Sequence, residues 1–273
     1  MKYLAAFLLL SLLSPGGEIK LTSYNIRQDT PGDRGDRDWS KRTPGVVRFL
    51  KDGGFSVIGL QEAKHNQVAD IQKGLPSFKQ LGVGRSDGKK GGEYSPLFYD
   101  PKIWTADAKE QGTFWLSDTP EKPGSMTWGN RVTRICSWAR LVGKDGKALY
   151  VYNTHWDHQS QPSREKAAVL ILERIKARKN TNEPVVLMGD FNATTANAAI
   201  KSLLTSKLVT DHGGADQRLT FNHWKPGLKP GLRIDHIFTS PSIKEAKFEV
   251  LADGDPVNSD HQPVVLTISG ESL

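Results

Sequence analysis

The strongest constraint on the fold is a set of short apolar runs that end in polar residues. Eight runs are rich in β-branched residues and bounded by Gly, Pro, Asn or Asp, which is typical of strands. They are Ile19 to Ile26, Ser56 to Leu60, Ser95 to Tyr99, Ile135 to Val142, Leu149 to Thr154, Val185 to Met188, Ile234 to Thr239 and Val264 to Ile268. The pattern therefore predicts more strands than helices.

Helical patterns lie between some of these runs. The clearest spans Ser163 to Lys179 and predicts a helix that packs on a sheet. Its apolar stripe consists of Ala168, Ile171, Leu172 and Ile175. Weaker patterns are Ser40 to Lys51, which Pro44 and Gly45 interrupt, and Lys64 to Lys73.

The spacing of the polar residues indicates two related halves. An extended run ends in Asn25, a helix follows, and the next apolar run ends in Glu62. The same order recurs from His155 to Asp190, over nearly the same interval. We interpret these segments as duplicated β-α-β units, and packing their sheets face to face would gather the strand ends along one edge.

The N-terminus differs from the rest of the chain. Lys2 precedes an apolar run from Tyr3 to Leu13, which is too short to span a bilayer but suits a secretory signal. We predict a signal peptide over residues 1–17, without a defined cleavage point, and export to the periplasm or the exterior. A buried first helix or strand is the alternative.

The remaining residues, 18–273, contain no low-complexity linker and are expected to form one domain. The single cysteine, Cys136, excludes an internal disulfide. We expect a monomer with no stable membrane insertion after signal removal. A net charge of +7 favours anionic partners such as nucleic acid, phosphorylated small molecules or lipid head groups.

Five polar clusters end apolar runs. They are Ser-Tyr-Asn25, Leu-Gln-Glu62, Asn-Thr-His155, Gly-Asp190-Phe-Asn192 and Ser-Asp260-His261. Any one of them is an ordinary strand-ending turn, because Asp and Asn are common turn formers. Five together indicate a site held at the edge of a sheet.

These clusters resemble motifs of the endonuclease/exonuclease/phosphatase family, which includes deoxyribonuclease-like enzymes, sphingomyelinases, inositol-polyphosphate phosphatases and deadenylases. Two further motifs, around Glu93 in Gly-Glu-Tyr-Ser-Pro-Leu-Phe and Asp235 in Arg-Ile-Asp-His-Ile-Phe, extend the resemblance over nearly all of residues 18–273. It implies an α/β fold, a four-layered sandwich of two packed mixed β-sheets flanked by helices. The segment Thr113 to Pro120 further resembles the deadenylase-related and exported bacterial branches.

The resemblance implies a divalent-metal site with one or two Mg²⁺ or Mn²⁺ ions. Carboxylate and amide oxygens suit these hard cations, so Glu62, Asn25 and Asp260 are the expected ligands. Asp190 is similar to the family's general base, and Asn192 would hold the water or a phosphate oxygen.

The histidines would act on the phosphate and the leaving group. His261 resembles the histidine that contacts the scissile phosphate, which Asp235 helps to position. His155 matches a candidate general acid, and Glu93 matches the carboxylate that orients it. Arg134, rather than Arg140, is the expected contact to the substrate phosphate.

Three residues lie outside the matched pattern. Asp157 is expected to position its neighbours, although a zinc cluster of His155, Asp157 and His158 is the alternative. Trp115 and Trp128 would either stack on a base or sugar or pack their own loop.

The sequence thus predicts a metal-dependent phosphoester hydrolase, foremost a phosphodiesterase or nuclease acting on nucleic acid. A sphingomyelinase-like or inositol-phosphate phosphatase-like hydrolase is the alternative. A binding module without catalysis is the more distant one, since no central residue of the pattern is missing.

Overall fold

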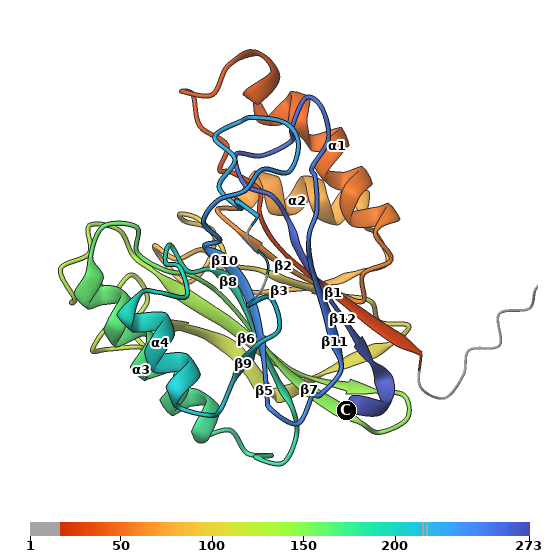
Figure 1. Cartoon of the computed structure of the whole chain (residues 1–273). Helices are drawn as coiled ribbons and strands as arrows, with labels where there is room; N and C mark the ends of the chain where they lie inside the picture. The colour runs from red at the N-terminus through yellow and green to blue at the C-terminus, as the bar shows by residue number, and fades with distance from the viewer. Residues whose placement is uncertain (1–16, 215, 217) are drawn as a thin grey trace, which may run out of the picture.

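The computed structural model describes residues 17–214, 216 and 218–273 (Figure 1). All but the last residue of the predicted signal peptide, 1–17, lies outside the described residues. A helix of sufficient length and apolarity to cross a bilayer is absent from the described part of the chain.

Two six-stranded sheets have the same arrangement of strands. The first has the order β11-β12-β1-β2-β4-β3 and the second the order β5-β6-β7-β8-β10-β9. In each sheet the third and fourth strands, β1 with β2 and β7 with β8, are parallel, and all other neighbours are antiparallel. The first sheet contains β1 (Glu18–Asn25), β2 (Val57–Gln61), β3 (Lys79–Leu81), β4 (Leu97–Tyr99), β11 (Ala246–Val250) and β12 (Val264–Ser269). The second contains β5 (Trp104–Trp115), β6 (Ile135–Gly143), β7 (Ala148–His155), β8 (Val185–Asp190), β9 (Thr210–Asp211) and β10 (Asp235–Thr239).

Helices cover the outer face of each sheet (Figure 1). The first sheet packs against α1 (Trp39–Asp52) and α2 (His65–Gly74), and the second against α3 (Gln161–Lys176) and α4 (Ala198–Thr205). Two short 3-10 turns, η1 (Gly35–Arg37) and η2 (Gly270–Ser272), complete the elements. A third apolar cluster, which includes Leu21, Val151 and Val186, fills the space between the sheets. The predicted four-layered sandwich is therefore confirmed.

A polar contact joins the two sheets within this apolar layer. Asn153 of β7 is fully buried and donates hydrogen bonds to the carbonyls of Leu60 (2.9 Å) and Pro96 (2.8 Å). Its side-chain oxygen accepts a hydrogen bond of 2.7 Å from Gln61 Nε2. These bonds fix the register of one sheet against the other because a buried amide without partners is costly.

The structure also contains elements that the sequence pattern did not predict. β5 is the longest strand, but its middle residues are polar and largely outside the core, so it lacks the apolar pattern of a buried strand. The short elements β3, β9, β11 and α4 were likewise not predicted. Conversely, α1 continues through Pro44 and Gly45 as one helix, where Gly45 allows close contact with Asn258.

Candidate active site

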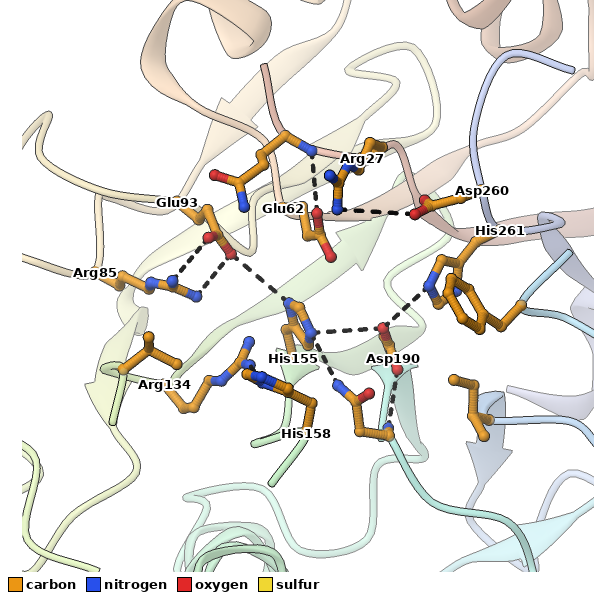
Figure 2. Close-up of a pocket in the computed structure, with 15 residues that line it drawn as sticks. Arg27, Glu62, Arg85, Glu93, Arg134, His155, His158, Asp190, Asp260 and His261 are labelled. Atoms are coloured by element: carbon orange, nitrogen blue, oxygen red, sulfur yellow. Dashed lines mark hydrogen bonds and ion pairs between the residues drawn. The ribbon is translucent and has the colours of Figure 1, made fainter. Parts of the chain in front are cut away.

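The polar strand ends meet at one edge of the sandwich. The parallel strands β1, β2, β7 and β8 end at this edge. Strands β10 and β12 are antiparallel to β8 and β1, so β10 starts at the same edge and the loop that precedes β12 lies there. They surround a pocket of about 400 Å³ (Figure 2). Its lining residues are Arg27, Gln28, Glu62, Arg85, Glu93, Val132, Arg134, His155, His158, Asp190, Asn192, Phe221, Ile234, Asp260 and His261.

On the side of the first sheet, Asn25 links two carboxylates. Its Nδ2 donates hydrogen bonds to Glu62 Oε1 (3.1 Å) and Asp190 Oδ2 (3.0 Å), whereas its Oδ1 accepts one from the backbone of Arg27. Asn25 therefore presents its amide nitrogen to the carboxylates, and its oxygen is engaged elsewhere. In this arrangement Asn25 holds Glu62 and Asp190 together, and its expected role as a metal ligand stays a prediction.

Glu62 and Asp260 are the other carboxylates of this side. Glu62 Oε2 accepts a hydrogen bond of 3.1 Å from the backbone of Gln28, and Asp260 Oδ2 lies 3.8 Å from Arg27 Nη1. Burial and the nearby Glu62 raise the pKa of Asp260, although His261 and Arg27 oppose the shift.

On the side of the second sheet, Asp190 is fixed from several directions. Its Oδ1 accepts a hydrogen bond of 2.9 Å from the backbone of Asn192, and its Oδ2 lies 3.5 Å from His155 Nε2. Burial and the negative charge of Asp235 raise the pKa of Asp190 to about 7, although His261 opposes the shift.

A chain of charged groups runs from Asp235 through His261 to Asp190. His261 Nδ1 donates a hydrogen bond of 2.9 Å to Asp235 Oδ2, and its Nε2 lies 3.8 Å from Asp190 Oδ2. Burial alone would lower the pKa of His261, but Asp235 and Asp190 outweigh it and raise the pKa to about 10. The two carboxylates thus favour the protonated form of the buried His261, whose Nε2 lies on the side of Asp190.

His155 lies between Asp190 and Glu93. Asn192 Nδ2 donates a hydrogen bond of 3.0 Å to His155 Nε2, so the proton of the neutral ring resides on Nδ1. Burial, Arg134 and Arg85 lower the pKa of His155 well below its usual value. The expected orienting carboxylate, Glu93, lies 3.9 Å from Nδ1.

Glu93 is held mainly by another partner. Both of its carboxylate oxygens accept hydrogen bonds of 2.7 Å from Arg85, in the two-pronged geometry that arginine forms with carboxylates. Burial nevertheless raises the pKa of Glu93. Glu93 is thus hydrogen-bonded to Arg85, and it lies near His155 without a hydrogen bond to it.

Arg134 lines the pocket next to His158 and Asp157. Its Nη2 donates a hydrogen bond of 3.0 Å to His158 Nδ1, and its Nε lies 3.7 Å from Asp157 Oδ2. Asp157 also accepts hydrogen bonds from two backbone N–H groups, which outweigh burial and lower its pKa. Because Arg134 occupies the space next to both residues, the arrangement favours a positioning role for Asp157 over the alternative zinc cluster.

The other predicted contacts lie outside the pocket. Trp115 is buried and donates a hydrogen bond to the carbonyl of Arg85, and Trp128 is buried and donates one to Asp118. Trp128 therefore packs within its own loop, whereas Trp115 packs against the loop that contains Arg85. Arg140 pairs with Glu183 and Asp107, away from the site.

The backbone around the pocket adopts unusual conformations. Arg27 (φ 57°), Glu62 (φ 62°) and Asn192 (φ 48°) are left-handed although none of them is glycine. Such residues cost about 1–3 kcal/mol each and persist where the surroundings fix them. Gly189 (φ 154°) packs so closely on the backbone of Thr154 that a Cβ would collide with it, which explains the glycine before Asp190.

The pocket suits a divalent cation. Ligand atoms of Asp190, Asp235 and His261 lie within 4.8 Å of one another and form a possible metal site. In this trio, however, Asp235 Oδ2 and His261 Nδ1 already bond to each other. Glu62 and Asp260 line the same pocket, and burial is the main cause of the raised pKa of Asp260. Either set supplies the hard oxygen ligands that Mg²⁺ or Mn²⁺ prefers.

Several pocket residues were not predicted from the sequence. Arg85 belongs to no strand end and has no motif of its own. Arg27 follows Asn25 by two residues, and this short distance in the sequence was the only indication that Arg27 lies near the pocket. Phe221, which lies against His261, and Ile234 contribute apolar surface to the pocket and could not be recognised without the fold.

Comparisons with known proteins agree with this geometry. The model of the endonuclease/exonuclease/phosphatase family matches residues 22–269. A family member from Bacteroides thetaiotaomicron is 31% identical over 93% of this chain and 98% of its own, with a TM-score of 0.84. A mannosyl-6-phosphatase from the same organism is 32% identical over 91% of this chain and 98% of its own, with a TM-score of 0.81.

A more distant structure shares the fold alone. TDP2 from D. rerio, in complex with a single-stranded DNA product, is 18% identical over 92% of this chain and 98% of its own, with a TM-score of 0.71. A search of curated proteins finds no match. With the family model covering nearly all of the described residues, the chain belongs to the endonuclease/exonuclease/phosphatase family and is a phosphoester hydrolase.

Proposed function

We propose that this protein is a divalent-metal-dependent phosphatase that hydrolyses phosphate esters of small sugars. The observation that carries the proposal is the pocket itself, in which Glu62, Asp190 and His261 converge from two sheets. Its volume of about 400 Å³ lies in the range of small-ligand sites. The similarity to a mannosyl-6-phosphatase, at 32% identity, supports the same substrate class.

The metal would be held by Glu62 and Asp260, with Asn25 positioning Glu62. A divalent cation there would neutralise negative charge on the phosphoryl oxygens. The family as a whole depends on such cations, and the pocket fits one.

The protein's own groups would direct the attack of water. Asp190 is oriented by Asn25 and by the backbone of Asn192, so its carboxylate can accept a proton from the attacking water. His261, fixed by Asp235, would donate a hydrogen bond to a phosphoryl oxygen. The Asn192 amide would contact the same phosphate.

The remaining groups would act on the leaving side of the ester. His155 would donate a proton to the leaving oxygen, and Arg134 would contact the substrate with the guanidinium edge that faces the pocket. Because burial lowers the pKa of His155, the ring would take up this proton from solvent as substrate binds.

Nucleic acid is the second candidate substrate. The net charge of +7 favours a polyanion.

The sequence also supports a further proposal, export through a signal peptide over residues 1–17. The monomeric state is proposed in the same way.

A substrate panel tests the function. It comprises mannose 6-phosphate, glucose 6-phosphate, single-stranded DNA, RNA, sphingomyelin and an inositol phosphate, each with Mg²⁺ and with chelator. Wild type should release phosphate from the sugars only with metal, and Asp190→Ala should lose about 10²- to 10⁴-fold in rate. Asp145→Ala, in the exposed turn after β6, is the matched control.

Two results would count against the proposal. Hydrolysis that persists in chelator, or full activity of Asp190→Ala, would refute the mechanism. If DNA or RNA is hydrolysed and the sugar phosphates are not, nucleic acid is the substrate and the proposed sugar phosphatase is wrong.

A further inference from the structure

A second pocket adjoins the active site at the end marked by Glu93. This distal pocket has a volume of about 430 Å³, and its lining includes Gln28, Lys64, Arg85, Glu93, Arg131, Val132 and Thr133. Four of these residues, Gln28, Arg85, Glu93 and Val132, also line the catalytic pocket. The two pockets are therefore continuous along the wall formed by Arg85 and Glu93.

The charges of the distal pocket do not balance. Its cationic residues are Lys64, Arg85 and Arg131, and its single carboxylate is Glu93. Arg85 and Glu93 bond to each other through both guanidinium nitrogens and both carboxylate oxygens, so they compensate one another. Within the described ranges, Lys64 and Arg131 form no ion pair with an acidic residue within 4.0 Å. Two positive charges thus remain without a protein partner.

A third cation, Arg134, lines the catalytic pocket and carries N–H groups without hydrogen-bond partners. Arg134 follows Val132 and Thr133 of the distal pocket, and its side chain is only 4% exposed. Its Nε and Nη1 have no hydrogen-bond partner among the described residues, although Nε lies 3.7 Å from Asp157. Buried guanidinium N–H groups without partners are costly, and an anion would satisfy them.

The order of residues along the pocket defines which part of the substrate reaches this region. Figure 2 shows Asp260 and His261 at one end, Arg85, Glu93 and Arg134 at the other, and His155 between them. If the reacting phosphate lies against Asp190 and His261, the leaving group extends past His155 toward Arg85. The cations of the distal pocket therefore face the alcohol part of the substrate.

We propose that the distal pocket binds a second phosphate carried by the leaving group, so that the preferred substrate is a sugar bisphosphate. This inference rests on the proposed function and specifies its substrate class. A second phosphate could also come from the chain of a short oligonucleotide, so the experiment contains one arm for each source.

The experiment separates binding from turnover. Binding is measured by calorimetry with the Asp190→Ala protein, using glucose 1,6-bisphosphate against glucose 6-phosphate and the dinucleotide pTpT against thymidine monophosphate. Hydrolysis of the same four compounds is measured with the wild type. The distal charges are removed in Lys64→Ala, Arg131→Ala and the double variant, each built in both backgrounds, with Lys144→Ala in the turn after β6 as the control.

The bisphosphate should bind at least tenfold more tightly than the monophosphate. The double variant should lose about tenfold of that preference, chiefly through KM, because each partly exposed ion pair contributes modestly. Its constants for the monophosphate, and all constants of Lys144→Ala, should be unchanged. A preference confined to pTpT would identify the second phosphate as that of a nucleotide chain and overturn the sugar bisphosphate.

Failure of this inference differs from failure of the proposed function. Hydrolysis of both sugar phosphates without preference, or a preference that survives in the double variant, would overturn the distal site and leave the phosphatase intact. Preferred binding of the bisphosphate without hydrolysis of any compound would support the distal site and refute the phosphatase.

Discussion

The two sheets have the same topology but contribute different chemistry to the pocket. Each sheet has a central parallel pair, with antiparallel strands on both sides in the same order. The first sheet ends in the amide of Asn25 and the carboxylate of Glu62. The second ends in the imidazole of His155 and the carboxylate of Asp190. In the proposed mechanism, one backbone plan thus supplies a metal-binding carboxylate from one side and proton-transfer groups from the other.

The two halves also differ in register. His155 is paired with Asp190, whereas Asn25 is paired with Gln61, one residue before Glu62. Gln61 points between the sheets toward Asn153, and Glu62 reaches the pocket through a left-handed backbone conformation. The difference teaches that equivalent strand ends need not carry equivalent functional residues, because one residue of displacement changes the face of the strand.

The largest expected effect tests which half holds the metal. Glu62→Gln should lower kcat/KM about a thousandfold, since a metal supplies several kcal/mol of charge stabilisation in the transition state. Addition of Mn²⁺ should raise the melting temperature of the wild type, because a ligand that binds only the folded state stabilises it. Glu62→Gln should lose this shift, and Asp235→Asn should retain it.

The control for that comparison is Glu245→Gln in the exposed segment before β11, which should behave as the wild type. The opposite pattern, in which Asp235→Asn loses the Mn²⁺ shift and Glu62→Gln keeps it, would place the metal on Asp190, Asp235 and His261. The proposal that the first sheet binds the metal and the second sheet transfers protons would then be wrong.

A smaller effect is expected at His155 and tests the proton-donating half. His155→Gln should slow hydrolysis of a sugar phosphate about a hundredfold, as is typical for loss of a general acid. The same variant should hydrolyse p-nitrophenyl phosphate within a few-fold of the wild-type rate, because that leaving group departs without a proton. Equal losses for both esters, measured as kcat/KM, would instead assign His155 to the orientation of Asn192.

The smallest expected effect concerns the contact that joins the halves. Asn153→Leu should lower the free energy of unfolding by about 2–4 kcal/mol, because it removes three buried hydrogen bonds, two to the carbonyls of Leu60 and Pro96 and one from the Gln61 amide. Urea unfolding measures the change. Asn182→Leu at an exposed turn is the control, and a change at Asn153 as small as that of the control would show that the sheets are held by apolar packing alone.

Much of the fold could be predicted from local sequence. The central strands are buried on both faces, so they appear as apolar runs that end in polar residues. Strand β5 was missed for the opposite reason, since its exposed middle has the polar composition of a loop. The helical pattern of α1 was weak because Pro44 and Gly45 interrupt it. The close contact of Gly45 with Asn258 cannot be predicted from the sequence.

The sequence by itself determined which residue types stand at the strand ends, and therefore that Asn25, Glu62, His155, Asp190 and His261 would meet. Only the tertiary structure decided what each group does there. In the structure, the amide nitrogen of Asn25 donates to Glu62 and Asp190, and Glu93 accepts hydrogen bonds from Arg85. His261 lies between the carboxylates of Asp235 and Asp190. The physical reason is that strand ends follow from local hydrophobic patterns, whereas hydrogen-bond partners and charges come from loops far apart in the chain.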